Sequence, residues 1–196
     1  MKEQELSIET DIIFDHHAKV NIAFASIDHD QFKEAAELLW LTSISNYRNN
    51  IYTIGNGASA AIAQHWACDY TKGCKSGGIR PRVISLAANI PLMTAISNDI
   101  SYEDVYAFQV NAFGQEGDVL VAISSSGNSP NVVAAIKEAK KLKVKTIALT
   151  GFSPDNECAK LADISLYVDC DEYEATEDVH QAIMHMIAKY IRQKNG

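Results

Sequence analysis

Two turns rich in glycine and serine are the first features of this sequence with the residue types for chemistry. One turn spans residues 55–59 and has the sequence Gly-Asn-Gly-Ala-Ser; the other spans residues 124–129 and has the sequence Ser-Ser-Ser-Gly-Asn-Ser. Each follows a short apolar run and precedes a segment with helical spacing. The start of a helix offers free N–H groups and a partial positive charge, and glycine lets the backbone approach a ligand. Both turns are therefore typical of a phosphate site.

Serine side chains strengthen this interpretation. The hydroxyl-bearing residues of the two turns are Ser59, Ser124, Ser125, Ser126 and Ser129. Small hydroxyl groups donate hydrogen bonds to phosphate oxygens without filling the site. Serine and glycine also form ordinary turns and helix caps, which is the simpler interpretation of one isolated turn. Two such turns favour the phosphate site, although neither is a dinucleotide or P-loop motif.

A second group of residues has the types needed for proton transfer or metal binding. His65 and Asp69 lie four residues apart in a segment of helical spacing, so they share a face. Glu177 and His185 lie eight residues apart and also share a face, whereas His180 points away from that line. Two carboxylates and two imidazoles suit general acid–base catalysis or a divalent ion such as zinc. Histidines with only a half-buried, hydrogen-bonding role are the alternative, because spacing alone does not bring the two pairs together.

The elements that would position these residues alternate between strand and helix. The first 50 residues show helical spacing in two segments, with Asp28 as the cap of the second. The sequence then predicts strands at 51–54, 82–86, 119–123, 144–149 and 164–168, and helices at 59–70, 91–97, 105–113, 132–142 and 176–193. The strands are continuous apolar runs, which is typical of a parallel sheet covered on both faces.

We therefore expect an α/β fold, a three-layer doubly wound sandwich with a central parallel sheet and an N-terminal helical extension. The expected organisation is one domain over residues 1–196, with the helices in 1–50 and the α/β core in 51–196. In open parallel sheets ligands bind beyond the carboxyl ends of the strands. Both glycine- and serine-rich turns are expected at that edge.

Composition excludes several classes of protein. The chain has 196 residues, enough for one core, and a formal net charge of −8, which argues against general nucleic-acid binding. The sequence has no run of about 18 apolar residues, so we expect no membrane span. The polar first residues are not followed by the apolar core of a signal peptide. Four cysteines are scattered without a CxxC pair, which favours reduced thiols. We expect a cytoplasmic protein that binds neither nucleic acid nor membrane.

The motifs resemble those of the sugar isomerase (SIS) domain family over nearly the whole chain. The resemblance is carried by residues 55–59, 64–67, 96–99, 117–129 and 148–151. Within that family the chain resembles the phosphoheptose isomerases, which convert sedoheptulose 7-phosphate into glycero-manno-heptose 7-phosphate through an enediol. The resemblance implies a single SIS domain, a phosphorylated sugar as substrate, and a homotetramer with active sites at subunit interfaces.

Individual roles follow from the resemblance together with the turn chemistry. Substrate and phosphate binding are expected at Asn56, Gly57, Ser59, Asp99, Ser124, Ser125, Ser126 and Ser129. The family's catalytic carboxylate falls on Asp69 and its catalytic histidine on His185. Its zinc site, with one ion per active site, falls on His65, Asp69, Glu177 and His185.

The chain departs from the family pattern at the reacting end of this site. Asp69 stands where the family carries glutamate, and Glu177 where it carries glutamine; residues 71–73 and 152–155 also differ. Three interpretations stay open: a site rebuilt around a metal, a different substrate, or weak activity. The alternative function is a non-catalytic SIS protein that binds a sugar phosphate or a replication initiator. Asp69 and His185 favour the enzyme, because a pure binding protein does not need both.

Overall fold

A five-stranded parallel sheet forms the centre of the computed structural model, which describes residues 2–45, 49–75 and 79–194. The strands are β1 (Ile51–Gly55), β2 (Val83–Ser85), β3 (Val119–Ser124), β4 (Lys145–Thr150) and β5 (Ile164–Tyr167). They lie in the spatial order β2-β1-β3-β4-β5, and each neighbouring pair is parallel. The five predicted strands are confirmed, with ends that differ by one residue.

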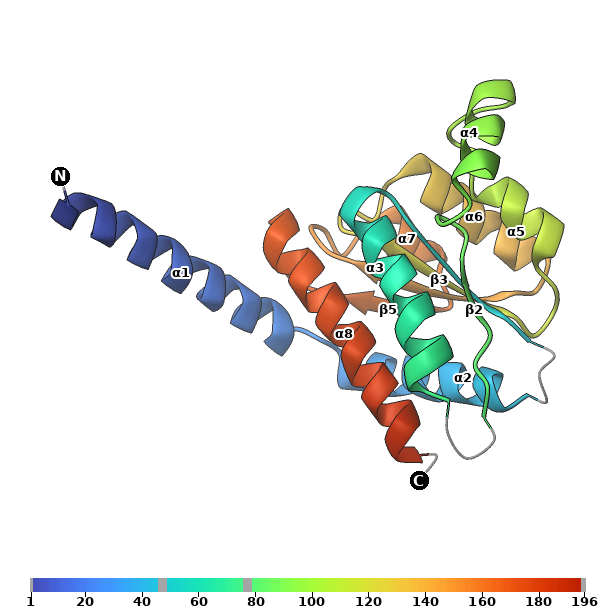
Figure 1. The fold of residues 1–196 in the computed structure, drawn as a ribbon, viewed down its shortest axis with the longest axis horizontal. Helices are drawn as coiled ribbons and strands as arrows, with labels where there is room; N and C mark the ends of the chain where they lie inside the picture. The colour runs from blue at the N-terminus through green and yellow to red at the C-terminus, as the bar shows by residue number, and fades with distance from the viewer. Residues whose placement is uncertain (1, 46–48, 76–78, 195–196) are drawn as a thin grey trace.

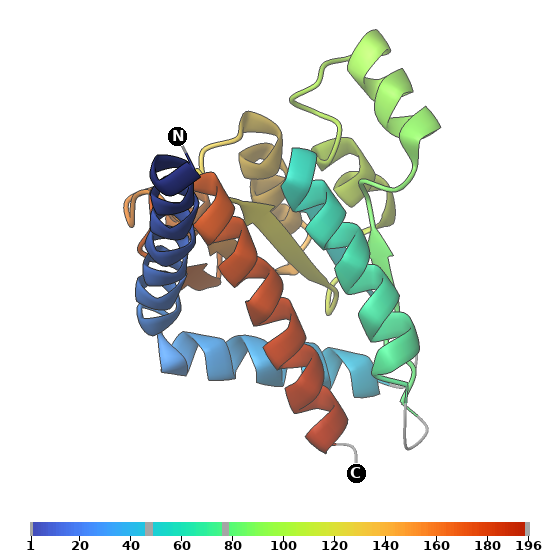
Figure 2. The ribbon, with the colours of Figure 1, turned by 60° about the vertical axis from the view of Figure 1, so that its left-hand side comes forward.

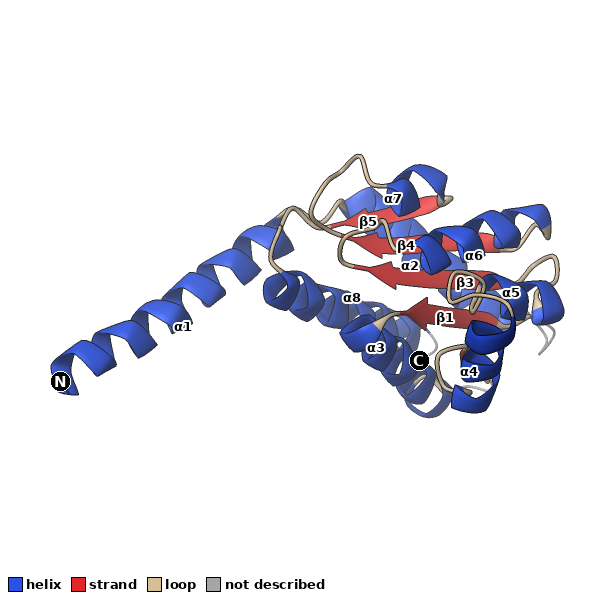
Figure 3. Cartoon of the chain, turned by 90° about the horizontal axis from the view of Figure 1, so that it is seen from above, coloured by secondary structure: helices blue, strands red, loops and turns tan. Residues whose placement is uncertain are grey.

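Helices cover both faces of this sheet (Figures 1 and 3). The α-helices in the described part of the chain are α1 (Lys2–Ala25), α2 (His29–Ile44), α3 (Gly57–Cys68), α4 (Ile90–Asp99), α5 (Ala107–Phe113), α6 (Pro130–Lys141), α7 (Glu157–Leu161) and α8 (Tyr173–Lys194). One hydrophobic core joins the sheet to α2, α3 and α8, and a second joins it to α5, α6 and α7. Successive β3 side chains alternate between the cores, as Val121 and Ala122 do. The predicted three-layer α/β fold is confirmed.

Helix α2 begins where the sequence predicts. The carboxylate of Asp28 accepts hydrogen bonds from the backbone N–H groups of Asp30 and Gln31, both at 2.9 Å. This cap satisfies donors that the first turn of a helix leaves free. The buried face of α2, which includes Ala35 and Leu39, then packs on the sheet.

Helix α1 projects away from the sheet (Figures 1 and 2). It contacts α8 through ion pairs such as His16 Nε2 to Asp178 Oδ2 at 2.9 Å. Among the residues of α1 whose burial the structure describes, five large apolar side chains are exposed: Ile12, Ile13, Phe14, Ile22 and Phe24. No helix in the described part of the chain, α1 included, has the sustained apolar stretch that a membrane span requires. The exposed side chains leave an apolar surface uncovered in the single chain.

Helix α3 continues into a short π-helical turn, η1 (Asp69–Gly73), instead of ending as a regular helix. Trp66 and Tyr70 are fully buried on either side of this junction and stack with ring centroids 5.2 Å apart. The stacked pair anchors the turn and leaves Asp69 partly exposed at its start. π-helical turns are frequent at functional sites, because they re-aim one side chain within a helix.

Candidate active site

A cavity of about 300 Å³ lies where β1 and β3 end and α3 and α6 begin. Both glycine- and serine-rich turns line it. Of the residues expected to bind substrate or phosphate, those on the cavity wall are Asn56, Gly57, Ser59, Ser124, Ser125, Ser126 and Ser129. Tyr173 and Glu177 of α8 complete the wall. The cavity therefore has the position that ligands take in open parallel sheets.

Glycine is required in the serine turn. Gly127 has a φ of +64°, a conformation that side chains rarely adopt. A Cβ at this position would lie 2.1 Å from Cγ of Asn156, so any larger residue would displace the neighbouring loop. The turn is closed by a hydrogen bond from the Gly127 N–H to the Ser124 carbonyl, at 2.9 Å. Across it, the hydroxyl oxygens of Ser124 and Ser129 lie 3.2 Å apart.

The two helices that start at the cavity lack side-chain caps. Asn56 and Ser129 occupy the cap positions of α3 and α6, and neither makes a side-chain cap hydrogen bond. By contrast, Asp28, Asn89 and Asn156 cap α2, α4 and α7 with their side chains. The free N–H groups at the starts of α3 and α6 are thus available to an anion in the cavity, and the helix dipoles favour negative charge there.

Asn56 is held in place by two residues that the sequence analysis did not single out. Its amide exchanges a pair of hydrogen bonds with the amide of Asn131, at 2.8 and 2.9 Å. The hydroxyl of Tyr102 also donates to Oδ1, the side-chain amide oxygen of Asn56, at 3.0 Å. Asn131 is the second residue of α6 and is buried. In the sequence, Asn131 is marked only by its position directly after Pro130, at the start of a predicted helix. Its contact with Asn56 depends on the fold.

Asp99 does not line this cavity. It ends α4, which stands away from the sheet (Figure 2), and its carboxylate accepts a hydrogen bond from its neighbour Asn98 at 2.8 Å. Asp99 is thus the expected substrate-binding residue that is not on the cavity wall of its own chain.

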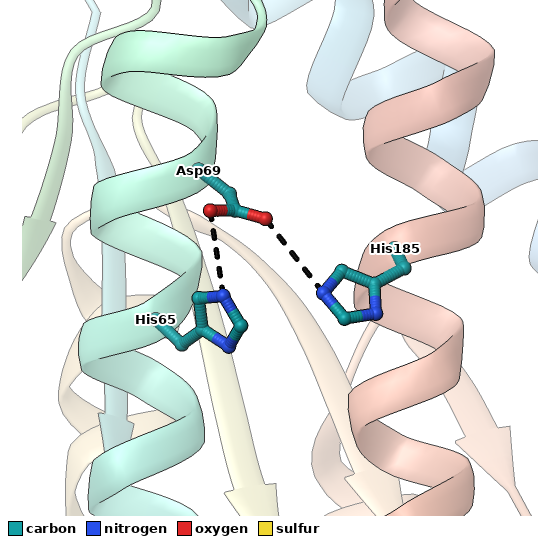
Figure 4. Close-up of side chains that lie close together, drawn as sticks. All are labelled: His65, Asp69 and His185. Carbon is teal, nitrogen blue, oxygen red and sulfur yellow. Dashed lines mark ion pairs between the residues drawn. The ribbon is translucent and has the colours of Figure 1, made fainter.

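The second candidate group comes together between α3 and α8 (Figure 4). The Asp69 carboxylate lies between two imidazoles: Oδ1 is 3.4 Å from His65 Nε2, and Oδ2 is 3.7 Å from His185 Nε2. The rings of His65 and His185 meet edge to face, with centroids 5.2 Å apart. Ligating atoms of all three residues lie within 4.8 Å of one another. The side chains are partly exposed, so a substrate or ion can reach them.

Gln181 joins the two histidines and was missed by the sequence analysis. Its amide nitrogen lies 2.9 Å from Nδ1 of His65 and 3.3 Å from Nε2 of His185. Gln181 is four residues before His185, so the two share a helix face. Since glutamine neither titrates nor binds metals strongly, Gln181 was not among the expected acids, bases and metal ligands.

Glu177 lies outside the group formed by His65, Asp69 and His185. It lines the cavity instead, and its pKa is raised by burial and by the nearby carboxylates of Glu174 and Asp178. The reason is helix geometry: eight residues of α8 separate Glu177 from His185, and this spacing shares a face but advances about 12 Å. Of the two pairs predicted from spacing, only His65 and Asp69 both share a helix face and lie in contact.

Helices α3 and α8 both run from the cavity to the Asp69 group. Helix α3 begins at the cavity wall with Gly57 and carries His65 farther along. Helix α8 likewise begins at the wall with Tyr173 and carries His185 farther along. The two helices thus connect the wall of the cavity with the Asp69 group.

Most of the chain is similar to known proteins. A family model described as SIS domain matches residues 15–151. A probable phosphoheptose isomerase of Thermoplasma acidophilum is 39% identical over 154 residues, which cover 79% of this chain and 84% of that protein. A phosphoheptose isomerase of Helicobacter pylori is 37% identical over 164 residues, 84% of each protein.

A solved structure extends the similarity to three dimensions. The phosphoheptose isomerase GmhA from Neisseria gonorrhoeae matches with a TM-score of 0.86 and 30% identity, over 96% of this chain and 99% of that chain. Sequence and fold thus agree along most of the length. The chain belongs to the SIS domain family and, within it, to the phosphoheptose isomerases.

Proposed function

We propose that this chain is a phosphoheptose isomerase, an enzyme that interconverts sedoheptulose 7-phosphate, a ketose, with the aldose glycero-manno-heptose 7-phosphate. One observation carries the proposal. The carboxylate of Asp69 and the imidazole of His185 face each other on the two helices that start at the serine-lined cavity. The family relationship supports the choice of substrate.

The chemistry needs a base and an acid close to two adjacent carbons. Removal of a proton from C1 and protonation of the C2 carbonyl oxygen give a cis-enediol, and protonation at C2 with loss of the proton on O1 then gives the aldose. Asp69 and His185 share these proton transfers in our proposal, because both lie at one point and both are partly exposed. Gln181 supports them by holding the His185 ring. The Asp69 arm, shorter than glutamate, still comes within 3.4 and 3.7 Å of the two imidazoles.

The phosphate takes the cavity at the other end of the substrate. Serine hydroxyls and the uncapped helix starts of α3 and α6 supply neutral donors for its oxygens. Anchoring the phosphate there fixes the reacting carbons near Asp69 and converts a chance encounter into a positioned one.

A zinc ion fits the residues of the Asp69 group. Two imidazoles and one carboxylate are a common protein ligand set for catalytic zinc, and their atoms lie within 4.8 Å of one another. We propose His65, Asp69 and His185 as the ligands, without Glu177. A bound zinc would polarise the carbonyl and hydroxyl oxygens of the sugar. Gln181 contacts both histidine rings and so orients them for either role.

The alternative function, a non-catalytic SIS protein that binds a sugar phosphate or a replication initiator, is not favoured. The relatives described above are named as phosphoheptose isomerases. A binding protein also has no use for the convergence of Asp69 with two histidines at a distance from the phosphate cavity.

We further propose that residues 1–196 act as one domain in a homotetramer with active sites at its interfaces. The exposed apolar side chains of α1 support self-association, because a buried contact would remove them from water. The position of Asp99 on α4, away from the cavity of its own chain, supports a site completed by a neighbouring copy. Four free cysteines, two of them buried, support a cytoplasmic location.

A turnover assay tests the proposed function. Purified protein is mixed with sedoheptulose 7-phosphate, and the sugar phosphates are followed by NMR, beside a panel of shorter phosphorylated ketoses. We expect conversion of the heptose to its aldose, faster than for the shorter sugars. Conversion of none of them would contradict the proposal and return the non-catalytic alternative to consideration.

A further inference from the structure

Helix α8 buries a histidine, His180, that no part of the proposed reaction uses. Its outer face carries Gln181 and His185, which belong to the candidate active site. Its inner face carries Thr176, His180 and Met184, four residues apart in turn, and all three are fully buried. A histidine is an expensive choice for this interior position, because an apolar side chain would fill the same space without the cost of desolvation.

Buried polar atoms without a partner occur in this helix and at the ends of two adjacent strands. Both ring nitrogens of His180 are buried and have no hydrogen-bond partner. The hydroxyls of Ser125 and Thr150 are in the same condition, and both residues lie at the carboxyl ends of adjacent strands, where Ser124 pairs with Thr150. A buried polar atom without a partner costs free energy, so native proteins keep such atoms where they serve function.

Contacts connect the His180 ring to the phosphate cavity. The ring lies against the backbone of Thr150. Burial lowers the pKa of His180 to about 4, although the Thr150 backbone opposes this shift, so the ring is neutral. The next residue, Gly151, donates its N–H to the carbonyl of Ser125 at 2.8 Å. Ser125 in turn lines the cavity. The path from helix to cavity thus has two steps along the backbone.

The packing of α8 leaves this path little freedom. A Cβ at Gly151 would lie 2.7 Å from Cγ2 of Thr176, one turn before His180 on the inner face of α8. The helix therefore touches the end of β4 closely at Gly151, while the His180 ring meets the backbone of Thr150. The end of β4 in turn holds the serine turn, through the hydrogen bond from Gly151 to Ser125.

We propose that His180 is a positioning residue for phosphate binding. Through the end of β4 at Thr150 and Gly151, its neutral ring sets the backbone of Ser125 and so the shape of the serine turn. A neutral imidazole offers one donor and one acceptor, which match hydroxyl and carbonyl groups without burying a charge. This inference rests on the proposed function only in taking the cavity as the phosphate site.

The test replaces the ring nitrogens while keeping a buried ring. In His180→Phe the unpartnered nitrogens are removed, so the variant is expected to fold with an unchanged or raised Tm. We expect the Kd for inorganic phosphate, measured by calorimetry, and the KM for sedoheptulose 7-phosphate to rise about tenfold, because the variant loses the interaction of the imidazole with the backbone of Thr150. We expect kcat to change less than about twofold, because the Asp69 group is untouched.

Three further variants separate positioning from packing. His180→Asn, which keeps a donor and an acceptor, is expected to recover part of the phosphate affinity. Thr150→Val removes a hydroxyl that has no partner and leaves the backbone of the path intact, so it is expected to leave the Kd and KM unchanged. Met184→Leu, one turn later on the same buried face, is the packing control and is expected to leave the Kd and KM unchanged.

An unchanged Kd and KM in a folded His180→Phe variant would overturn the inference. If that variant does not fold, His180→Leu, which also lacks the ring nitrogens, decides, and normal phosphate affinity there would overturn it equally. Equal losses in Met184→Leu would also overturn it, since they would show a general effect of packing. Phosphate binding is measured without turnover, so a wild-type protein that binds phosphate but isomerises nothing would contradict the proposed function and leave this test intact.

Discussion

The carboxylate of Asp69 lies 3.7 Å from the imidazole of His185, measured from Oδ2 to Nε2. The first residue begins the π-helical turn after α3, and the second lies midway along the last helix. Since the pair is brought together only by the packing of α3 against α8, its geometry depends on the whole sheet and not on local sequence. This contact is the centre of the proposed reaction (Figure 4).

The serine turn is expected to control phosphate affinity. Ser124→Ala and Ser126→Ala each remove one hydroxyl from the cavity wall, and we expect each to raise the KM for the sugar phosphate about tenfold with a smaller effect on kcat. Steady-state kinetics measure this. Ser45→Ala, at the end of α2, is the matched control, because among the described residues Ser45 bonds only to the carbonyl of Thr42 in its own helix end. A normal KM in both cavity variants would remove the serines from phosphate binding.

Metal binding is expected to depend on His65. Elemental analysis of the purified protein should find zinc near one equivalent per chain, and His65→Gln should lower it, because one of three ligands is lost. His29→Gln, which changes an exposed histidine at the start of α2, should leave the metal content unchanged. Dialysis against a chelator should reduce activity, and added zinc should restore it. Full activity in metal-free protein would contradict the zinc proposal.

Acid is expected to destabilise the fold through His180. Its pKa falls from 6.5 to about 4 in the folded protein because the ring is buried. The unfolded chain therefore takes up a proton in this window and the folded chain does not, so the contribution is complete above pH 6.5 and disappears as the pH falls to about 4. It amounts to about 3 kcal/mol of the free energy of unfolding.

Urea unfolding at pH 7 and pH 4.5 measures this contribution. The free energy of unfolding of the wild type should decrease more between these pH values than that of His180→Phe, which has no group titrating in the window. Carboxylates titrate in both proteins and cancel in the comparison. Equal decreases would show that His180 is not a buried neutral histidine.

Helix α1 is expected to hold copies of the chain together. Phe14→Glu places a charge among the exposed apolar side chains of α1, next to Ile13. We expect the mass measured by light scattering after gel filtration to fall from that of a tetramer to a smaller assembly, because a charge cannot be buried there without a partner. Glu34→Gln, on the exposed side of α2, is the control. A wild-type protein that is already a monomer would contradict the proposed tetramer.

Much of the fold could be predicted because its signals are local. The apolar run at β3 is buried from Val119 to Ser124, and a strand covered on both faces has no other pattern. The cap at Asp28 was likewise visible in the sequence. The π-helical turn at Asp69 was not, because it depends on the burial of Trp66 and Tyr70 against the core. Local sequence propensity does not depend on that packing and so cannot predict the turn.

The candidate site was predictable in its residue types but not in its arrangement. Spacing of four residues correctly paired His65 with Asp69, since that spacing means contact in a helix. Spacing of eight residues placed Glu177 on the face of His185 but too far along the helix for contact. Gln181 and Asn131 were passed over, because an amide acts through its orientation, and orientation comes from tertiary structure.

Deuterium exchange during turnover tests the central claim most directly. The protein is incubated with sedoheptulose 7-phosphate in D₂O, and NMR follows the protons on C1 of the ketose and C2 of the aldose. We predict deuterium at both carbons with the wild type and none with Asp69→Asn, which keeps the shape of the side chain and its phosphate affinity but loses the base. Exchange that persists in Asp69→Asn would exclude Asp69 as the base, and absence of both exchange and aldose with the wild type would contradict the isomerase.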